Sequence, residues 1–541
     1  MANSVPIFLN LLFFFSAAFI CFTITKNSRS ILSIFRDKLF ITIFLSALIF
    51  KGFFLFFPFY GLEYEDSYVF TSCTRFLHFT SDWLHDPFQT KTCIAGSIES
   101  CNSFATFGGH FITLSYLGFL ITKITGYNNL IICSINFASS LLSIPILFKL
   151  SENIFRKKSV SYFVIFCYTI APAINCFHTS GLSETFSSFI ILLSLLFYFK
   201  SSKNETVFFI GYIIFTCFAI CIKRENVILL FFPILDFFIC KCYKQKFRVS
   251  SLQILFGYVF FILLILFLHY QVNVFTLEGN ESLDIGQSTF SIGNQINQFP
   301  TFIKCLLTFN YFTVLGYFLL IGLVLLLFLH KANHFVLYPF GLIVLYSILY
   351  TSHYRSYYAV KYNELVPFEY LRYITNIFPF IALFVGYWLD YLWKKCEPFF
   401  NPIFFLVPTI IIIAYLSVAV RLDFSKEEKY NRVDPVLNVI NMIDERNDIV
   451  LSDIPMVFQI MGKQYLQIYD FTGMNADKVK NLAYRKTLNK KANIYLMIRI
   501  NKEERDMDIN RWPEAFSIIR NFKSEVIKEE LGPYTLMKIE L

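Results

Sequence analysis

The apolar run LFITIFLSALIFKGFFLFFPF at residues 39–59 is followed, after one tyrosine, by the acidic stretch GLEYEDSYVF at residues 61–70. The run is long enough to cross a bilayer, which takes about 20 apolar residues. Three acids, Glu63, Glu65 and Asp66, therefore stand where the chain leaves an apolar segment. Carboxylates at a membrane boundary are costly unless they are solvated, paired or used in chemistry. The sequence predicts a transmembrane helix that opens into an acidic loop.

The composition of the whole chain is that of a membrane protein. Of its 541 residues, 56% are hydrophobic and only 16% are charged, and the mean hydropathy is +0.56. A soluble protein of this size needs a more highly charged surface. The net charge of +9 comes mostly from short basic clusters between apolar runs, so it does not indicate a nucleic-acid partner. We predict an α-helical polytopic membrane protein with about 12 transmembrane helices.

The predicted spans are apolar runs bounded by charged or turn-forming residues. They lie near residues 7–24, 39–59, 129–150, 159–178, 184–200, 206–222, 226–242, 251–270, 309–329, 334–351, 372–393 and 402–420. Four basic clusters follow the first, third, seventh and eleventh of these runs, and alternation puts all four on one side. Basic loops are cytoplasmic by the positive-inside rule, so both termini and the intervening loops are predicted to be extracytoplasmic.

This topology divides the chain into three parts. Residues 1–38 form an extra N-terminal span with a basic cytoplasmic loop, and residues 39–423 form the transmembrane domain, with a long outer loop at 60–128. In that loop GGHFITLSYLGFLITKITG, at 108–126, is predicted to be a helix lying in the membrane interface. Residues 424–541 have ordinary globular composition and are predicted to form a small extracytoplasmic α/β domain.

Short segments give more detail on the outer side. Within the C-terminal domain DIVLSDIP, KQYLQIYDF, NIYLMIRI and YTLMKIEL read as strand-containing segments, and VLNVINMI reads as amphipathic. The stretches 272–308 and 352–371 are predicted to be outer loops between spans. Cys93 and Cys101 lie in a polar part of the long outer loop, where a short disulfide can form if that side is extracytoplasmic.

Other charged residues are predicted to share the outer face with the acidic stretch. HTSGLSETF at 178–186 places Glu184 at the start of a span, and IKRENV places Lys223 and Arg224 in a tight outer hairpin. A third segment, YRSYYAVKYNELVPFEYLRY at 354–373, carries Arg355 and Arg372 among aromatic residues.

These outer charges can be explained either by structural roles or by a role in catalysis. The acids can cap helices, Glu225 can neutralise a neighbouring cation, and tyrosines are common at membrane interfaces. Together, however, a carboxylate that accepts a proton and cations that hold a phosphate suit transfer of a group from a lipid phosphate. The sequence contains no Walker A or dinucleotide-binding motif, so no nucleotide site is expected.

Four segments, taken in order, resemble motifs of a known enzyme class. They are EDSYVFTSCTRFL at 65–77, LSETFSSFIILL at 182–193, CIKRENVILLFFP at 221–233 and LRYITNIFPFIAL at 371–383. The resemblance is to glycosyltransferases of the C-type fold that use polyprenyl-phosphate sugars, in the protein O-mannosyltransferase and aminoarabinose-transferase branch. It covers about residues 39–420, so the fold that it implies is GT-C-like.

The resemblance implies roles for particular residues. Glu65 and Asp66 occupy the acid pair that supplies the catalytic base, and Glu184 is the second outer acid. The usual Asp-Glu order is reversed here, so either acid can be the base, with Asp66 as our choice. His110 falls where the family has a basic residue before Pro-Pro, although this sequence lacks those prolines. The predicted donor-phosphate-binding residues are Lys223, Arg224, Arg372, His110 and Arg355.

The implied function is transfer of a monosaccharide from an undecaprenyl or dolichyl phosphate carrier to a protein, glycolipid or glycan acceptor. The reaction would occur on the extracytoplasmic side of a bacterial inner membrane or its equivalent, with inversion. No cofactor is expected. His330 and His334 are spaced like helical zinc ligands but lack a third ligand, so no motif supports a metal site. Dependence on a divalent metal stays open at this point, because two of the outer acids could bind one.

Two other functions remain open at this point. A transporter or flippase for a lipid-linked sugar could use the same charges as a binding site, although transporters favour charges near the midplane and paired repeats. A non-catalytic assembly protein could use the outer domain to hold partners, but that function leaves the acids and cations unexplained.

Overall fold

The computed structural model describes most of the helical part of the chain and much of the C-terminal sheet. The described residues are 4–53, 70–71, 73–75, 77–78, 106–107, 110–111, 113–201, 206–245, 247, 249–272, 292–329, 334–352, 366–396, 412, 415–416, 419, 434–443, 448–452, 464–467, 493–499, 523–531 and 534–540.

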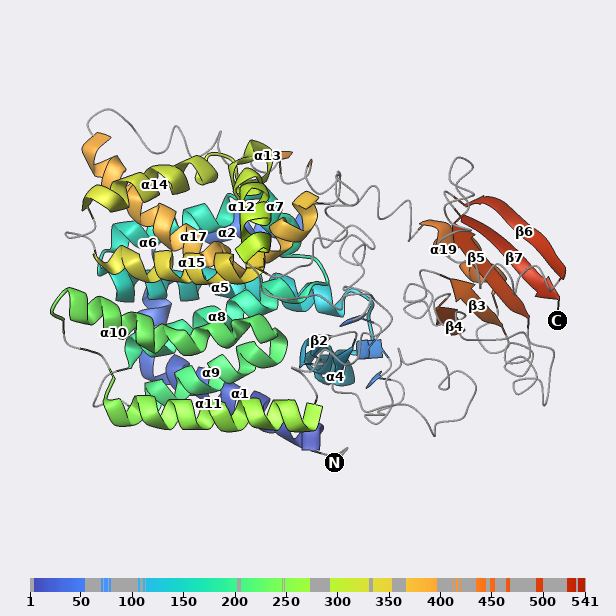
Figure 1. Cartoon of the computed structure of the whole chain (residues 1–541), viewed down its shortest axis with the longest axis horizontal. Coiled ribbons are helices and arrows are strands. Elements are labelled where there is room, and N and C mark those ends of the chain that lie inside the picture. The colour runs from blue at the N-terminus through green and yellow to red at the C-terminus, as the bar shows by residue number, and fades with distance from the viewer. Residues whose placement is uncertain are drawn as a thin grey trace.

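As far as it is described, the helical part consists of α-helices with two short strands and two 3₁₀-helices between them (Figure 1). In chain order the elements are α1 (Ser4–Ile34), α2 (Lys38–Phe53), β1 (Thr106–Phe107), β2 (His110–Phe111), α4 (Thr113–Thr125), α5 (Ile131–Phe155), α6 (Lys158–Thr169), α7 (Pro172–Phe177), α8 (Ser183–Lys200), α9 (Thr206–Ile222), η3 (Arg224–Phe231), α10 (Phe232–Cys242), α11 (Ser251–Val272), α12 (Ile292–Leu307), α13 (Phe309–Phe312), α14 (Leu315–Leu329), η4 (His334–Val336), α15 (Leu337–Ser352) and α17 (Val366–Cys396).

Every span predicted between residues 7 and 393 contains helical structure as far as it is described, and residues 54–59 of the second span lie outside the described residues. Among the described residues, α5, α8, α17 and the segment His334–Thr351 are long and apolar enough to cross a membrane by length and composition. Shorter apolar helices lie in α1, α9, α11 and α14. The last predicted span, 402–420, lies mostly outside the described residues. The predicted interfacial segment forms α4.

Some predicted boundaries were wrong. The single span expected at 159–178 is broken into α6 and α7, because Pro172 begins α7 and the preceding Ala171 is extended. The predicted basic loop after the first span is partly helical, since α1 continues to Ile34.

The predicted outer loop at 272–308 also contains a helix. Residues 292–307 form α12. This helix was not predicted because its polar residues interrupt the apolar run by which spans are recognised. Phe302 and Leu306, toward its C-terminal end, are buried, while Ile292 and Ile296, in its first turns, are exposed. Likewise, α17 begins at Val366, inside the predicted loop at 352–371.

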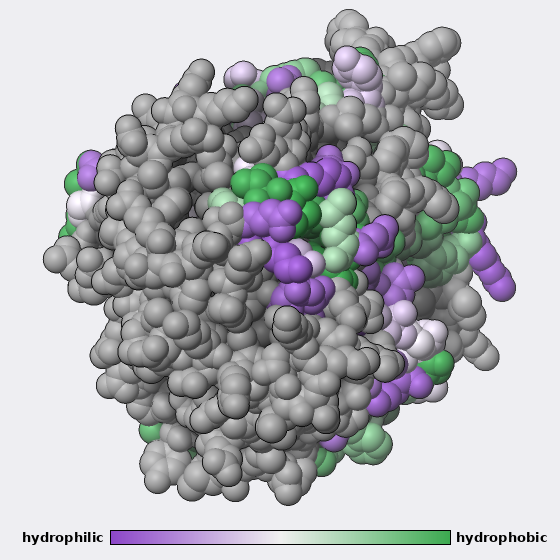
Figure 2. All heavy atoms as spheres, turned by 90° about the vertical axis from the view of Figure 1, so that its right-hand side faces the viewer, coloured by the Kyte–Doolittle hydropathy of each residue, from purple (hydrophilic) through white to green (hydrophobic). Residues whose placement is uncertain are grey.

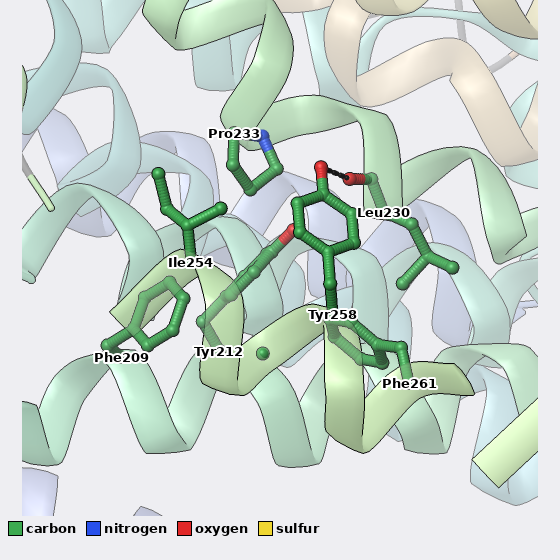
Figure 3. Close-up of a pocket in the computed structure, with 8 residues that line it drawn as sticks. Phe209, Tyr212, Leu230, Pro233, Ile254, Tyr258 and Phe261 are labelled. Atoms are coloured by element: carbon green, nitrogen blue, oxygen red, sulfur yellow. Dashed lines mark hydrogen bonds between the residues drawn. The ribbon is translucent and has the colours of Figure 1, made fainter. Parts of the chain in front are cut away.

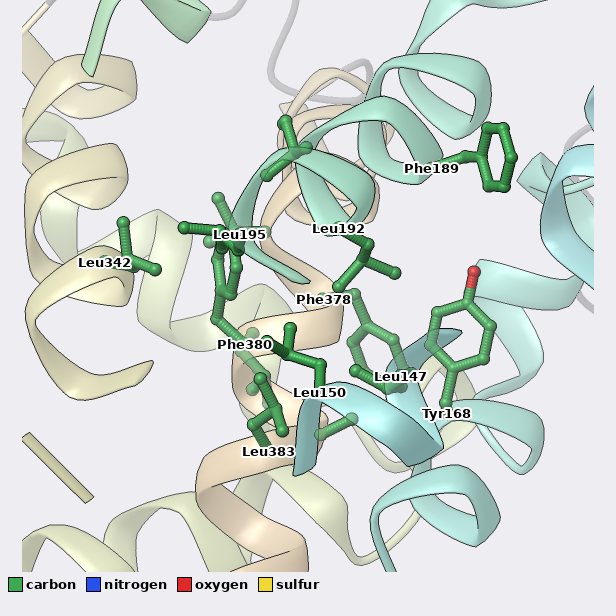
Figure 4. Packing of buried hydrophobic residues seen from close by; sticks show 14 of the residues in the cluster. Leu147, Leu150, Tyr168, Phe189, Leu192, Leu195, Leu342, Phe378, Phe380 and Leu383 are labelled. Atoms are coloured by element: carbon green, nitrogen blue, oxygen red, sulfur yellow. The ribbon is translucent and has the colours of Figure 1, made fainter. Parts of the chain in front are cut away.

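Helices α8 and α17 lie at the centre of the helical part. Every residue of α8 from Ser183 to Phe199 is buried, and α17 is buried from Leu371 to Trp388. Their apolar side chains interdigitate with those of α5, α6 and α15, as Leu147, Phe378 and their neighbours show in Figure 4. A helix that is apolar all round must be buried or in a membrane, and here the central helices are buried by other helices.

The peripheral helices expose apolar side chains instead. Leu252 and Leu255 of α11 are 75% and 62% exposed, and Leu327 and Phe328 of α14 are 73% and 78% exposed. Large apolar surfaces of this kind are unfavourable in water but are expected where helices face lipid. The fold is therefore that of a polytopic membrane protein.

Close contacts hold the helices together at the side predicted to be cytoplasmic. Asp37 caps α2 by accepting hydrogen bonds at Oδ1 from the backbone N–H groups of Leu39 and Phe40, both at 3.1 Å. Its other oxygen accepts hydrogen bonds from Lys158 Nζ, at 2.7 Å, and from Tyr162 of α6.

The C-terminal part is a small sheet with a short helix. It consists of α19 (Asp434–Val439), η7 (Ile440–Met442), β3 (Ile449–Ser452), β4 (Gln464–Gln467), β5 (Ile494–Arg499), β6 (Lys523–Leu531) and β7 (Tyr534–Glu540). The strand order is β4-β3-β5-β7-β6. Strands β4, β3 and β5 are parallel to one another, and β7 is antiparallel to both of its neighbours, β5 and β6. Figure 2 looks at the end of the molecule that carries this sheet, where described hydrophilic side chains lie beside hydrophobic ones. The sequence did not predict β6, which pairs with β7. Its sequence, KSEVIKEEL, contains many charged residues and so lacks the apolar pattern by which strands are recognised.

Candidate functional site

Glu184 lies in the first turn of α8, but its side chain does not cap the helix. Its Oε1 atom accepts a hydrogen bond from Lys223 Nζ at 2.7 Å and another from Arg372 Nε at 2.5 Å. All three side chains are buried, with 1% of Glu184 and 6% of each cation exposed. These three residues, which we call the ion triad, come from α8, the α9–η3 link and α17.

The ion triad carries an excess of positive charge. Two buried cations share one carboxylate, and Oε2 of that carboxylate has no hydrogen-bond partner among the described residues. Burying charge is costly unless the charges are paired. Within the ion triad itself cations therefore outnumber acids, which makes this group a candidate to receive an anion.

An aromatic stack lies beside the cations. Lys223 Nζ lies 5.3 Å from the centroid of the Tyr373 ring, and Arg372 Cζ lies 6.0 Å from it. Tyr350 stacks on Tyr373 with the ring centroids 4.7 Å apart. Such contacts stabilise a cation on the face of a ring and limit where the ammonium and guanidinium groups can move.

Asn226 fixes the segment that holds Lys223. Its Nδ2 atom donates to Ser187 Oγ of α8 and to the Ala219 carbonyl of α9, both at 2.8 Å. Its Oδ1 atom accepts from the Tyr346 hydroxyl at 3.1 Å and from Asn376 Nδ2 at 3.3 Å. One amide thereby links four elements around the ion triad, which keeps the short α9–η3 link in place.

Arg224 is placed differently from the two buried cations. It begins η3 directly after Lys223 and is only half-buried. Within the part of the chain that the structure describes, it makes no ion pair or hydrogen bond through its side chain. Arg224 is therefore a half-buried cation next to Lys223 in sequence, without a partner among the described side chains.

The structure brings together Glu184, Lys223 and Arg372 from the predicted site, with Arg224 next in sequence. Sequence reasoning missed Asn226, Tyr346 and Asn376, which support them. The available signal was their polarity within apolar segments, since polar residues in spans usually face the protein interior.

The remaining predicted residues are outside what the structure describes. Glu65, Asp66 and Arg355 lie outside the described residues, as do Cys93 and Cys101. The backbone of His110 is described, in β2, where it pairs with Phe107 of β1, but its side chain is not.

The predictions about other polar residues had mixed outcomes. His330 lies outside the described residues, whereas His334 stacks on Tyr243 with the ring centroids 4.9 Å apart. No group of metal-binding side chains is present among the described residues. Asp390 and Lys394, four residues apart on α17, form an ion pair at 2.7 Å.

An apolar crevice lies apart from the ion triad, between α9, α11 and the η3–α10 segment (Figure 3). Two tyrosines in its wall use their hydroxyl groups internally: Tyr258 donates to the Leu230 carbonyl at 2.9 Å and Tyr212 to the Leu229 carbonyl at 2.7 Å. The crevice consequently offers apolar surface rather than polar groups for chemistry.

Comparisons with known proteins identify the fold but no sequence relative. No family profile matches the sequence, and neither does any curated protein. ArnT (aminoarabinose transferase) from Cupriavidus metallidurans, bound to undecaprenyl phosphate, superposes with a TM-score of 0.57 at 10% identity, covering 92% of this chain and 97% of ArnT. Its apo structure gives a TM-score of 0.55 at 10% identity, covering 87% of this chain and 93% of ArnT.

A second group of similar structures is archaeal. The oligosaccharyltransferase AglB from Archaeoglobus fulgidus, in complex with an inhibitory peptide and a dolichol-phosphate, superposes with a TM-score of 0.51 at 11% identity, covering 94% of this chain and 74% of AglB. Both similar proteins are polytopic and polyprenyl-phosphate-dependent. This chain therefore has the C-type glycosyltransferase fold.

Proposed function

We propose that this protein is a membrane glycosyltransferase that moves a monosaccharide from a polyprenyl-phosphate carrier to an acceptor on the extracytoplasmic side. The observation that carries the proposal is the ion triad with Arg224 beside it, in a fold shared with ArnT and AglB. The α9–η3 link and α17 supply three cations, Lys223, Arg224 and Arg372. A phosphodiester carries one negative charge, so it complements this group.

In the proposed reaction the acceptor attacks the anomeric carbon of the sugar with inversion. The proton of the attacking acceptor group passes to Asp66 or Glu65. A bond forms between the acceptor and the sugar, and the bond between the sugar and the phosphate breaks. The electron pair of that bond stays with the phosphate, whose new charge Arg224 and the two buried cations stabilise. The contacts of Glu184 favour a positioning role, because a carboxylate that holds two cations is a poor general base.

The phosphate role is tested by replacing Arg224. We expect Arg224→Ala to weaken binding of undecaprenyl phosphate by about 10- to 100-fold, the range of one charge-assisted hydrogen bond. Binding would be measured with the purified protein in lipid nanodiscs. The matched control is Lys395→Ala, an exposed cation at the far end of α17 from Arg372, which should leave the affinity unchanged. Unchanged affinity in Arg224→Ala would refute the phosphate role.

The transferase function is tested by replacing the acid that we chose as base. Wild-type protein should transfer radiolabelled sugar from a polyprenyl-phosphate donor to endogenous membrane acceptors, and Asp66→Asn should lose transfer while still binding donor. Equal transfer by both would move the base to Glu65. If the wild type binds donors but transfers sugar from none, the transporter function becomes the better explanation.

A further inference from the structure

A second buried polar cluster lies at the end of α2, and the proposed chemistry does not use it. Lys51 is fully buried, and its Nζ atom donates to Asn175 Oδ1 at 2.7 Å and contacts Nδ1 of His178. The other ring nitrogen of His178, Nε2, lies 3.1 Å from the Tyr168 hydroxyl. Lys51 Nζ also lies 5.3 Å from the centroid of the Tyr168 ring.

The cluster places an ionisable amine where burial is expensive. An ammonium at Lys51 makes Nδ1 of His178 an acceptor, which puts the ring proton on Nε2, facing Tyr168. Among the described residues no carboxylate pairs with Lys51. A methionine would fill the same space at no electrostatic cost, so packing alone does not account for a lysine here.

The cluster is connected to the ion triad through a short turn. His178 begins the segment 178–183, which leads directly into α8 and to Glu184. Asn136 of α5 clamps this turn, since its Nδ2 atom donates to the carbonyls of Ser180 and Leu182, both at 2.6 Å. A displacement of His178 is thus transmitted to the start of α8 rather than absorbed by a loose loop.

We propose that Lys51 is a positioning residue for the anion site at Glu184, an inference that rests on the proposed function. Lys51 holds His178, the clamped turn follows His178, and the turn fixes the carboxylate on which Lys223 and Arg372 converge. Lys51 acts on the phosphate through these residues and does not touch it.

The test begins with Lys51→Met, which keeps the length of the side chain and removes its charge. The dissociation constant for undecaprenyl phosphate should rise about tenfold, within the range of coupling seen between linked sites. In transfer assays KM should rise in parallel while kcat changes less, and binding of uncharged undecaprenol should not change. Lys149→Met is the control, because Lys149 pairs with Glu152 at 2.7 Å on α5, outside the cluster.

A second experiment tests whether the loss of affinity for undecaprenyl phosphate in Lys51→Met depends on Glu184. In a Glu184→Gln background, Lys51→Met should cost much less than in the wild type, because the triad that Lys51 positions is already disrupted. An equal loss of affinity in both backgrounds would overturn the proposal, as would full affinity in Lys51→Met alone. If Lys51→Met folds poorly, Lys51→Met with His178→Phe replaces the whole pair by apolar groups and serves in its place.

A third arm needs no ligand and so separates this proposal from the proposed function. Hydrogen exchange of peptides covering 178–186 and 223–231 should be faster in the Lys51 variant than in the wild type, with α11 peptides unchanged. Unchanged exchange at 178–186 would overturn the positioning role. Failure of the wild type to bind undecaprenyl phosphate would overturn the proposed function, whatever the exchange shows.

Discussion

At the scale of single residues, the central feature is a carboxylate that serves two buried cations. Glu184 accepts from Lys223 and Arg372 through the same oxygen, in a region from which water is largely excluded. The strength of each interaction is increased by the low local dielectric, and so is the cost of losing it. Removing one partner of such a group leaves the others buried without compensation.

We therefore expect Glu184→Ala to lower the free energy of unfolding by about 3–5 kcal/mol. Glu184→Gln should cost less, because its amide oxygen can still accept a hydrogen bond. The comparison is Glu152→Ala, which removes a partly exposed ion pair with Lys149 and should cost less than about 1 kcal/mol. Denaturant titration in mixed micelles measures the free energy of unfolding of all three variants. Similar losses of stability for Glu184→Ala and Glu152→Ala would show that the buried triad contributes no more to stability than a partly exposed ion pair.

At the scale of elements, short polar contacts fix how neighbouring helices meet. Gly386 of α17 packs against α6 so closely that an added Cβ would lie 2.7 Å from the backbone nitrogen of Val164. At the end of the same helix pair that is predicted to be cytoplasmic, Lys394 donates to Ser159 Oγ at 3.1 Å and to Asp390 at 2.7 Å. Small residues that allow close approach and polar side chains that bridge helices are the usual means of packing in membranes.

Asp37 provides a test of one such contact. It lies in the loop between α1 and α2, where burial raises the pKa of its carboxyl but hydrogen bonds from Lys158, Tyr162 and the backbone of Phe40 outweigh burial and lower the pKa to about 2. A carboxyl with a lowered pKa stabilises the folded state above its unfolded pKa of about 4, and this contribution is lost as the pH falls toward 2.

Asp37→Ala should lower the free energy of unfolding by about 1–2 kcal/mol at neutral pH, since it removes a helix cap and an ion pair. Asp37→Asn should cost less because asparagine also caps helices, and its stability should depend less on pH between about 4 and 2. Thermal unfolding at several pH values gives both quantities. The cap assignment would be wrong if the alanine and asparagine variants were equally stable at pH 7.

At the scale of the whole molecule, the distribution of charge sets the expected orientation. Basic clusters follow α5 and α10 and occupy the last turn of α17, whereas Glu184 lies at the start of α8 and Lys223 directly after the end of α9. Because positive loops are usually retained in the cytoplasm, we expect the ion triad and the C-terminal sheet to lie on the extracytoplasmic side.

Reporter fusions test this orientation. Alkaline phosphatase fused after residue 541 should be active and a fluorescent reporter there should be dark, because the former folds only outside the cytoplasm and the latter inside it. The reverse pattern is expected for fusions after Gln245, in the basic loop that follows α10. A bright fluorescent reporter at the C-terminus would contradict the topology and move the proposed reaction to the other side of the membrane.

The sequence by itself determined the membrane class, the positions of most helices and the segments from which the charged site is drawn. Apolar runs report spans because lipid and protein interiors both reject polar groups, and this constraint acts locally along the chain. Prediction from apolar runs was wrong where polar and apolar residues are mixed along the chain. These places are the polar helix α12, the charged strand β6 and the break before Pro172.

Only the tertiary structure decided which charges meet. Glu184 and Arg372 are separated by 188 residues, and Lys51 and His178 by 127, so no local pattern could pair them. The sequence grouped Glu184 with the acids as a catalytic residue, whereas packing of α8 against α9 and α17 makes it the partner of two cations. The physical reason is that burial selects partners by proximity in space, because an ionised side chain in a dry core is stable only when opposite charge or hydrogen bonds reach it.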